Sequence, residues 1–186
     1  SQTSLVYYNN GELISTLKGV KDVYYIEYED IPTAVINAII VTEDRKFFSH
    51  NGIDYLANIR AAIALIKNKG EITQGASTIT QQLARNVFLT HEITYERKIR
   101  EIFIAQELEK VYSKDKIMEF YINNIYYANG YYGIMAAADG YFGKGVNQLS
   151  LSELIFLCAI PNNPGRYDPI EHKENTIERR DRILKQ

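Results

Sequence analysis

The sequence has few of the residues that build disulfide-linked, zinc-binding or fibrous proteins. Cys158 is its only cysteine and its three histidines are scattered, which excludes an internal disulfide and a cysteine-based zinc site. Four prolines and eleven glycines in 186 residues leave room for long helices. No run reaches the roughly 18 to 20 apolar residues of a membrane span. One globular domain is therefore expected.

The charges nearly cancel and tryptophan is absent. Lys and Arg total 21 and Asp and Glu total 23, so the net charge is −2. This balance predicts no nucleic-acid partner and requires any anion site to be local. Fifteen tyrosines are present, and tyrosine suits wet clefts, although a tyrosine-rich chain is more often simply well packed.

Apolar periodicity and turn residues predict a mostly α fold in which residues 1–30 form a small β segment and residues 31–186 a helical domain. A hairpin is expected over 5–17, around an Asn-Asn-Gly turn, with a further strand over 23–28. Helices follow, with start and stop signals at most ends. Their expected ranges are 33–44, 53–68, 77–88, 94–112, 116–124, 133–142, 150–160 and the charged tail 171–186.

Two carboxylates stand where apolar side chains are expected. At 100° per residue, Glu43 falls within about 60° of the isoleucine stripe of its helix, and Glu101 falls on the apolar stripe of 94–112. Arg97 and Lys98 lie one turn before Glu101. Such a carboxylate either forms a structural salt bridge or lines a cleft, where a raised pKa suits acid or base chemistry. For a single carboxylate, the structural salt bridge is the commoner explanation. Two such carboxylates on separate helices make the odds between a salt bridge and a cleft more even.

Residues 74–86 are rich in hydrogen-bonding groups. A glycine loop that leads into a Ser/Thr-capped helix offers free N–H groups and hydroxyls to an anion, and Arg85 adds a positive charge. The alternative is a solvated, well-capped helix. Polar residues on nearly every face favour a substrate surface. It is not a Walker loop, because Gly75 is not followed by Gly-Lys-Ser/Thr.

Residues 43–52 match the pattern E-D-x-x-F-x-x-H-x-G at every fixed position, and 75–86 resemble G-G-S-T-I-T-Q-Q-x-x-K-N. These are the first two motifs of the peptidoglycan glycosyltransferases (glycosyltransferase family 51), the amino-terminal module of class A penicillin-binding proteins, which the sequence therefore resembles. Residues 97–101 resemble R-K-x-x-E, while 116–144 and 149–169 resemble a fourth and a fifth motif. The matches run in order across about two thirds of the chain.

The sequence departs from the family pattern at four positions. Ala76 stands where a second glycine is usual, and Ala128 replaces a common glycine. Arg85 replaces the usual lysine, which exchanges a point charge for a planar fork. Ile93 stands where many relatives carry a basic residue. The number of basic groups at the phosphate site therefore differs from the family pattern.

The resemblance implies a lysozyme-like, two-lobed helical fold whose smaller lobe faces the membrane. It implies that the 4-hydroxyl of an acceptor attacks C1 of a growing glycan chain built from lipid II, the undecaprenyl-diphosphate-linked disaccharide-pentapeptide. The product would be a β-1,4 link formed with inversion, and undecaprenyl diphosphate would be released. A divalent metal (Mg²⁺ or Mn²⁺) at the diphosphate and a moenomycin-type inhibitor are further implied ligands.

The resemblance also implies a location and residue roles. It indicates the extracytoplasmic face of the bacterial cell membrane, with an N-terminal anchor helix absent from this sequence, and a helix over 53–66 that dips into the membrane interface unless it is an ordinary core helix. Glu43 is expected to be the catalytic base, and Glu101 to orient cations, hold a metal or assist the leaving group. The expected substrate-binding residues are Asp44, Phe47, His50, Gly52, Gly75, Ser77, Thr78, Gln81, Gln82, Arg85, Asn86, Arg97, Lys98, Arg100 and Asn123.

Two other functions stay open. A lytic transglycosylase or hydrolase would use one or both carboxylates to cut glycan, but a neutral glycosidic bond needs no cation cluster. A non-catalytic glycan- or lipid-binding module would have no use for two inward carboxylates. His50 could equally be a histidine whose hydrogen bonds are satisfied within the fold.

Overall fold

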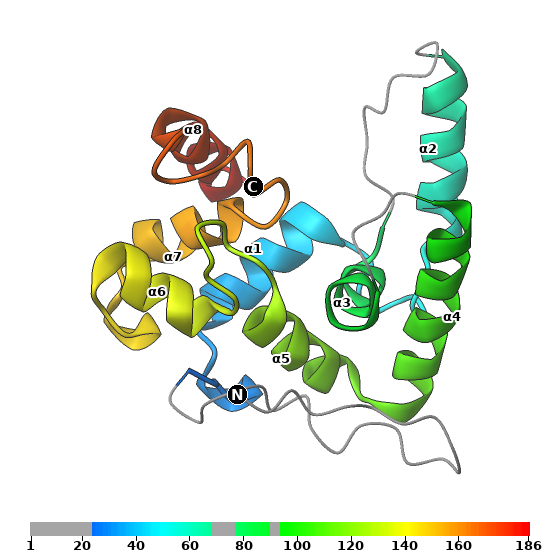
Figure 1. The fold of residues 1–186 in the computed structure, drawn as a ribbon, viewed down its shortest axis with the longest axis horizontal. Helices are drawn as coiled ribbons and strands as arrows, with labels where there is room; N and C mark the ends of the chain where they lie inside the picture. Colours follow the sequence, from blue (N-terminus) through cyan, green and yellow to red (C-terminus); the bar gives the residue numbers. More distant parts are fainter. Residues whose placement is uncertain (1–23, 68–76, 90–93) are drawn as a thin grey trace. The chain divides into compact units, whose positions relative to one another are not determined.

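The fold is almost entirely helical. The structure is a computed structural model that describes residues 24–67, 77–89 and 94–186 (Figure 1). Within these ranges it contains eight α-helices and two short 3-10 helices, and the only β pairing is an isolated bridge between Tyr126 and Tyr132. The predicted mostly α class is confirmed. The hairpin expected over 5–17 lies outside the described residues.

The helices fall close to the ranges expected from the sequence. They are α1 (Thr33–Glu43), α2 (Tyr55–Lys67), α3 (Ile79–Phe88), α4 (Tyr95–Val111), α5 (Lys114–Asn124), α6 (Ile134–Phe142), α7 (Leu151–Ala159) and α8 (Lys173–Leu184), with 3-10 helices at Tyr28–Asp30 and Val146–Gln148. None of the described helices is long and apolar enough to cross a bilayer. The chain divides into two compact units: residues up to Thr42 with Met118–Gln186 form unit 1, and Glu43–Ile117 form unit 2.

In unit 1, α7 is the most buried helix and packs against α8 and α6 (Figure 1). Its core residues are the run Leu154 to Ala159, and Pro161 follows one residue after the C-cap. A glycine in the left-handed conformation, Gly143, ends α6 as its sequence position predicts. The carboxy-terminal turn of α8 is held by buried Ile183. The packing faces of α7 and α8 therefore follow from the positions of their apolar residues.

The strand expected over 23–28 is wrong for the described residues 24–28, which run into a 3-10 helix instead. Side chains of α5 take the place of a partner strand. Asn123 bonds to both the N–H and the carbonyl of Ile26, at 2.9 and 2.8 Å. Glu119 accepts from the Tyr28 N–H at 3.2 Å and from the Tyr25 hydroxyl. Burial and Glu119 together raise the pKa of Tyr25.

In unit 2, α3 packs against α4. The N-cap of α3 is Thr78 rather than the expected Ser77, and it forms a capping box with Gln81. The Thr78 N–H donates to Gln81 Oε1 at 3.0 Å, while the Gln81 N–H donates to Thr78 Oγ1 at 3.1 Å. Polar residues of its first turn are buried beside Ile79 and Leu83. A buried polar turn needs specific hydrogen-bond partners.

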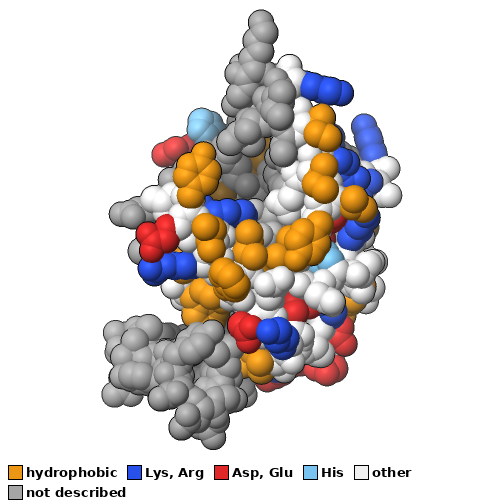
Figure 2. Space-filling view, turned by 90° about the vertical axis from the view of Figure 1, so that its right-hand side faces the viewer, with side chains coloured by type: hydrophobic (Ala, Val, Ile, Leu, Met, Phe, Trp, Pro, Cys, Tyr) orange, Lys and Arg blue, Asp and Glu red, His pale blue; other side chains and the backbone are white. Residues whose placement is uncertain are grey.

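A face of unit 2 formed by α2 and α4 is apolar and exposed, and it is called the α2/α4 face below. Figure 2 shows hydrophobic side chains gathered over it. Its members are Tyr55, Leu56, Ile59 and Ile63 of α2 and Tyr95, Ile99 and Phe103 of α4. Leu56 and Ile59 belong to the apolar stripe predicted over 53–68, but they are 59% and 56% exposed and therefore do not lie in the core. Ile53, before α2, is buried.

We expect the start of α7 to contribute to the pH dependence of stability. The Lys144 ammonium and the Ser150 N–H lower the pKa of Glu153 to about 2. Because the folded-state pKa is depressed, the contribution is present above the unfolded value near 4.5 and is lost as the pH falls toward 2. The difference in melting temperature between the parent and Glu153→Gln should therefore shrink from pH 5 to pH 2. The matched control is Glu178→Gln on the exposed side of α8, and an equal trend there would contradict this origin.

Candidate active site

Glu43 ends α1 with its carboxylate half-buried beside α3. It lies one turn after buried Ile39, as the isoleucine stripe predicts. The Gln82 amide donates to Glu43 Oε2 at 3.4 Å. A carboxylate that is partly shielded from water and still reachable is suited to accept a proton from a bound hydroxyl.

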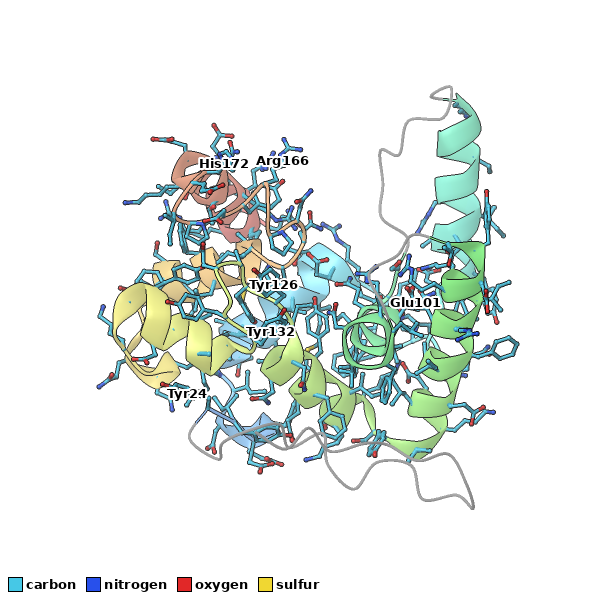
Figure 3. All side chains as sticks on the ribbon, viewed as in Figure 1. Tyr24, Glu101, Tyr126, Tyr132, Arg166 and His172 are labelled. Atoms are coloured by element: carbon cyan, nitrogen blue, oxygen red, sulfur yellow. The ribbon has the colours of Figure 1, made fainter. Side chains whose placement is uncertain are left out.

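A second cluster lies on the side of α4 that faces α3, where Figure 3 labels Glu101. Glu101 is fully buried, with Arg97 Nη1 at 3.1 Å from one oxygen and Lys98 Nζ at 2.5 Å from the other. Lys98 Nζ also donates to Ser77 Oγ at 2.9 Å. We call Ser77, Arg97, Lys98 and Glu101 the cation cluster. Two cations around one carboxylate leave one net positive charge in this place.

The cation cluster contains an unsatisfied donor. Arg97 Nε is buried and has no hydrogen-bond partner within the described structure. Buried donors are normally paired, and an unpaired guanidinium N–H suits an anionic oxygen. The cluster therefore has both the charge and the free donor that a phosphate group would use.

Helix α3 links Glu43 to the cation cluster. Ser77, just before its cap, contacts Lys98, and Gln82, one turn inside the helix, contacts Glu43. Arg85 and Asn86 follow Gln82 by three and four residues and are half-buried. The two carboxylates singled out from the sequence are thus both linked to the amino-terminal half of one short polar helix and the residue before its cap.

Other predicted site residues hold the fold of unit 2 together. The Phe47 ring is fully buried. Gly52 has φ +88°, and a Cβ there would lie 3.0 Å from the Ala105 carbonyl oxygen on α4. The Thr78 hydroxyl donates to the Gly52 carbonyl at 2.6 Å, and Gln81 closes the capping box. The substrate-binding roles predicted for these residues stay predictions.

Asp44 and His50 bond to each other and to backbone. Asp44 Oδ2 lies 2.7 Å from His50 Nε2 and accepts the Ile79 N–H at 3.0 Å. His50 Nδ1 accepts the Gly52 N–H at 3.1 Å. The carboxylate of Asp44 thus satisfies one of the free N–H groups at the start of α3.

Three predicted site residues remain, which are Arg100, Asn123 and Gly75. Arg100 pairs with Glu96 at 2.6 Å on the exposed side of α4, with side chains 65% and 75% exposed. Asn123 belongs to unit 1 and holds Ile26, as described above. Gly75 lies outside the described residues.

One buried ion pair in this region was missed from the sequence. Lys114 Nζ lies 2.7 Å from Glu109 Oε1, donates to the His50 carbonyl at 2.6 Å and lies 4.6 Å from the centroid of the Phe47 ring. Glu109 Oε1 also accepts the Thr80 hydroxyl at 2.6 Å. Five residues separate Glu109 from Lys114 across a helix break, so no helical spacing signals the pair.

The described residues do not provide a metal site of their own. Within the ranges given above, no group of three or more His, Cys, Asp or Glu side chains could hold an ion. Both Glu101 oxygens are bound by cations. This donor set does not fit Mg²⁺ or Mn²⁺, which take oxygen ligands, so no step is assigned to a metal.

Comparison with known proteins identifies the family of the chain. A family model described as transglycosylase matches residues 10–186, and the chain belongs to that family. Together with the relatives below, this match makes the chain a peptidoglycan glycosyltransferase domain of the kind found in class A penicillin-binding proteins. The family predicted from the motifs is confirmed.

The relatives are much longer proteins. The chain is 49% identical to penicillin-binding protein 1A of Aquifex aeolicus (strain VF5) over 99% of its length, which is 25% of that protein. It is 42% identical to penicillin-binding protein 4 of Bacillus subtilis (strain 168), over 99% of the chain and 30% of that protein. The chain is 42% identical to penicillin-binding protein 1A of Escherichia coli (strain K12), over 96% of the chain and 21% of that protein. The chain thus spans about a quarter of such relatives.

The burial of Glu101 predicts a stability effect. Glu101→Gln leaves Arg97 and Lys98 without their carboxylate, and breaking such a buried pair should lower the free energy of unfolding by about 3 to 5 kcal/mol. Glu96→Gln, which breaks the exposed pair on the same helix, should cost less than about 0.5 kcal/mol. Urea unfolding of both variants measures the two values. Equal losses of unfolding free energy in the two variants would show that the buried ion pair contributes no more to stability than the exposed pair.

Proposed function

We propose that this domain polymerises lipid II into β-1,4-linked glycan strands, with inversion at the donor anomeric carbon and release of undecaprenyl diphosphate. The observation that carries the proposal is that Glu43 and the cation cluster are both linked to the start of α3, the first through Gln82 and the second through Ser77. A half-buried carboxylate suits proton removal, and a cluster with net positive charge suits a diphosphate. A hydrolase acting on a neutral glycan would need only the first of these.

In the proposed step, Glu43 accepts the proton of the acceptor 4-hydroxyl. The hydroxyl oxygen forms a bond to C1 of the terminal N-acetylmuramic acid of the growing chain as the bond from C1 to the diphosphate oxygen breaks. The electron pair of that bond leaves with the undecaprenyl diphosphate, whose charge Lys98 and the free Arg97 Nε–H would stabilise. The proton remains on Glu43 until it is lost to solvent.

The same cation cluster would bind a moenomycin-type inhibitor, because a phosphoglycolipid presents an anionic phosphate of the same kind. Ser77, Gln82, Arg85 and Asn86 would position oxygens of phosphate or sugar. A divalent metal at the substrate's own diphosphate stays a prediction. Among the described residues, no group of three or more His, Cys, Asp or Glu side chains would hold it.

We further propose a lysozyme-like arrangement of two lobes, supported by the two compact units, and a location at the extracytoplasmic face of the bacterial cell membrane. The α2/α4 face supports docking of unit 2 on the membrane surface. It exposes seven large apolar side chains on two helices, a pattern typical of surfaces that meet lipid or protein. A substrate with a polyprenyl tail favours lipid.

The first test of this function is Glu43→Gln. The amide keeps the size of the side chain but cannot accept the acceptor's proton, so glycan polymerisation should fall by about 10² or more. The assay supplies lipid-linked disaccharide precursor and resolves the products as a ladder of polymers. Near-normal polymerisation at saturating precursor would remove Glu43 as the base.

The product pattern and inhibitor binding complete this test. The parent should yield a polymer ladder, whereas shortened glycan would indicate a lytic enzyme and unchanged precursor a binding module. Binding of a moenomycin-type inhibitor should survive in Glu43→Gln, because the cation cluster is intact. Loss of inhibitor binding together with activity would indicate misfolding rather than loss of a base.

A second test concerns the α2/α4 face. Replacing Leu56 and Ile59 by serine removes two exposed apolar anchors, each worth about 1.5 to 3 kcal/mol when fully buried in an apolar phase. Sedimentation with liposomes should show bound protein reduced at least tenfold. The control is Leu151→Ser with Ile170→Ser, two exposed apolar residues of unit 1. Equal losses in both pairs would contradict docking through α2 and α4.

A further inference from the structure

Helix α2 carries positive charge along one border of its exposed apolar stripe. At 100° per residue, this stripe spans about 100° of the helix circumference, from Tyr55 to Leu56. Arg60 and Lys67 lie about 20 to 40° beyond Leu56, and both are exposed. They are two turns apart, about 10 Å along the same side of the helix. The sequence of α2 contains no Asp or Glu. We call Arg60 and Lys67 the cationic border of the α2/α4 face.

The charge of the cationic border is not cancelled by the residues that precede α2. Asp54 accepts the Ala57 N–H at 2.9 Å, and this hydrogen bond, together with Lys46 and Arg60, lowers the pKa of Asp54. Its carboxylate therefore stays negative and is shared between the start of α2 and two cations. Three cations, Lys46, Arg60 and Lys67, set against the one carboxylate of Asp54, leave a net charge of +2 here.

The charges beside the apolar stripe of α4 cancel in pairs. Arg100 pairs with Glu96 at 2.6 Å, and Lys110 pairs with Glu107 at 2.6 Å. The positive charge of the α2/α4 face is therefore concentrated on α2. Figure 2 shows Lys and Arg side chains beside the hydrophobic side chains of this face.

An apolar face with cations at its border matches the chemistry of a bilayer whose headgroups carry net negative charge. In an interfacial helix, apolar side chains enter the boundary between headgroups and acyl chains. The long stems of Lys and Arg lie along the same surface and place their charged ends at headgroup level. A protein partner could also cover an exposed apolar face. The excess of positive charge at the border favours anionic lipid.

We propose that the α2/α4 face binds anionic phospholipid in preference to zwitterionic phospholipid, with Arg60 and Lys67 at the level of the lipid phosphates. This inference rests on the proposed membrane docking and adds the class of headgroup, which the apolar residues alone do not select. Each Lys or Arg close to an anionic membrane surface strengthens binding about fivefold, so the cationic border should contribute about 30-fold.

The test is sedimentation of the protein with two kinds of vesicle, one of phosphatidylcholine and one of equimolar phosphatidylcholine and phosphatidylglycerol, both without lipid-linked precursor. The parent should bind the mixed vesicles more tightly. Arg60→Gln combined with Lys67→Gln should weaken binding to mixed vesicles about 30-fold, and binding to neutral vesicles less than about threefold, because the apolar residues are unchanged.

The matched control removes the same two charges from unit 1. Arg182→Gln combined with Lys185→Gln, at exposed positions near the end of α8, should change binding to mixed vesicles by less than about threefold. An equal loss in this pair would assign the effect to overall charge and overturn the proposal. Equal binding of the parent to both kinds of vesicle would overturn it too. If the parent binds neither, the face has a protein partner and the proposal is wrong.

A measurement on the parent alone covers the case in which the double variant does not fold. At an ionic strength of about 1 M the Debye length falls to about 3 Å, so exposed charges are largely screened. The preference for mixed vesicles should then disappear, while binding to neutral vesicles should persist. A preference that survives high salt would contradict an electrostatic origin.

Glycan polymerisation in a neutral detergent separates this inference from the proposed function. The Arg60→Gln, Lys67→Gln variant should polymerise lipid-linked precursor at the parental rate there, because neither cation touches the reacting atoms. A loss of polymerisation in detergent would place these cations on the substrate and overturn the proposal. Failure of the proposed function has a different result, since the parent itself would then form no polymer.

Discussion

The first turn of α3 is the constraint on which unit 2 depends. Three successive residues of this turn each donate to a different partner: Thr78 to the Gly52 carbonyl, Ile79 to Asp44 and Thr80 to Glu109. Residues 44–52 and α4 are thereby tied to the same turn. Because every donor is buried, losing any one bond would leave an unsatisfied polar group, which is costly in a low-dielectric interior. The turn is therefore held rigid by these hydrogen bonds in addition to the apolar packing of Ile79 and Leu83.

This rigidity explains how Glu101 can be fully buried as part of a charged cluster. The charges of Arg97 and Lys98 compensate the carboxylate, and Ser77 takes a further hydrogen of Lys98. A buried ion pair gives little net stability compared with apolar packing. Its value here is placement, because the carboxylate orients two cations that would otherwise extend into solvent. The cations of such a site are already oriented, so an anion can bind with little reorganisation of the protein.

The sequence predicted the helices, both carboxylates and the family, because each has a local signal. Periodicity located Glu43 and Glu101, and caps located the ends of α6 and α7. The sequence could not predict that Asn123 and Glu119 would replace a partner strand for residues 24–28. These contacts join residues about ninety positions apart, and no local pattern indicates them. Nor could it separate Thr78 from Ser77 as the cap, or find Lys114 and Glu109, because these depend on tertiary geometry.

Periodicity predicted the buried side of α4 but not the second, exposed apolar side of the same helix. In α4 the residues Arg97, Glu101 and Ala105 follow one side, and Tyr95, Ile99 and Phe103 the opposite side. Glu101 is buried on the first side together with Ala105 and Leu108, while the second side is apolar and exposed, so apolar residues occupy both sides of the helix, unlike an ordinary surface helix. One helix therefore separates the cation cluster from the α2/α4 face by about its own diameter, 10 to 12 Å. When the α2/α4 face docks on the membrane as proposed, this thickness sets the distance between the cation cluster and the apolar side chains in the lipid. A diphosphate at the lipid surface then lies one helix diameter from those side chains.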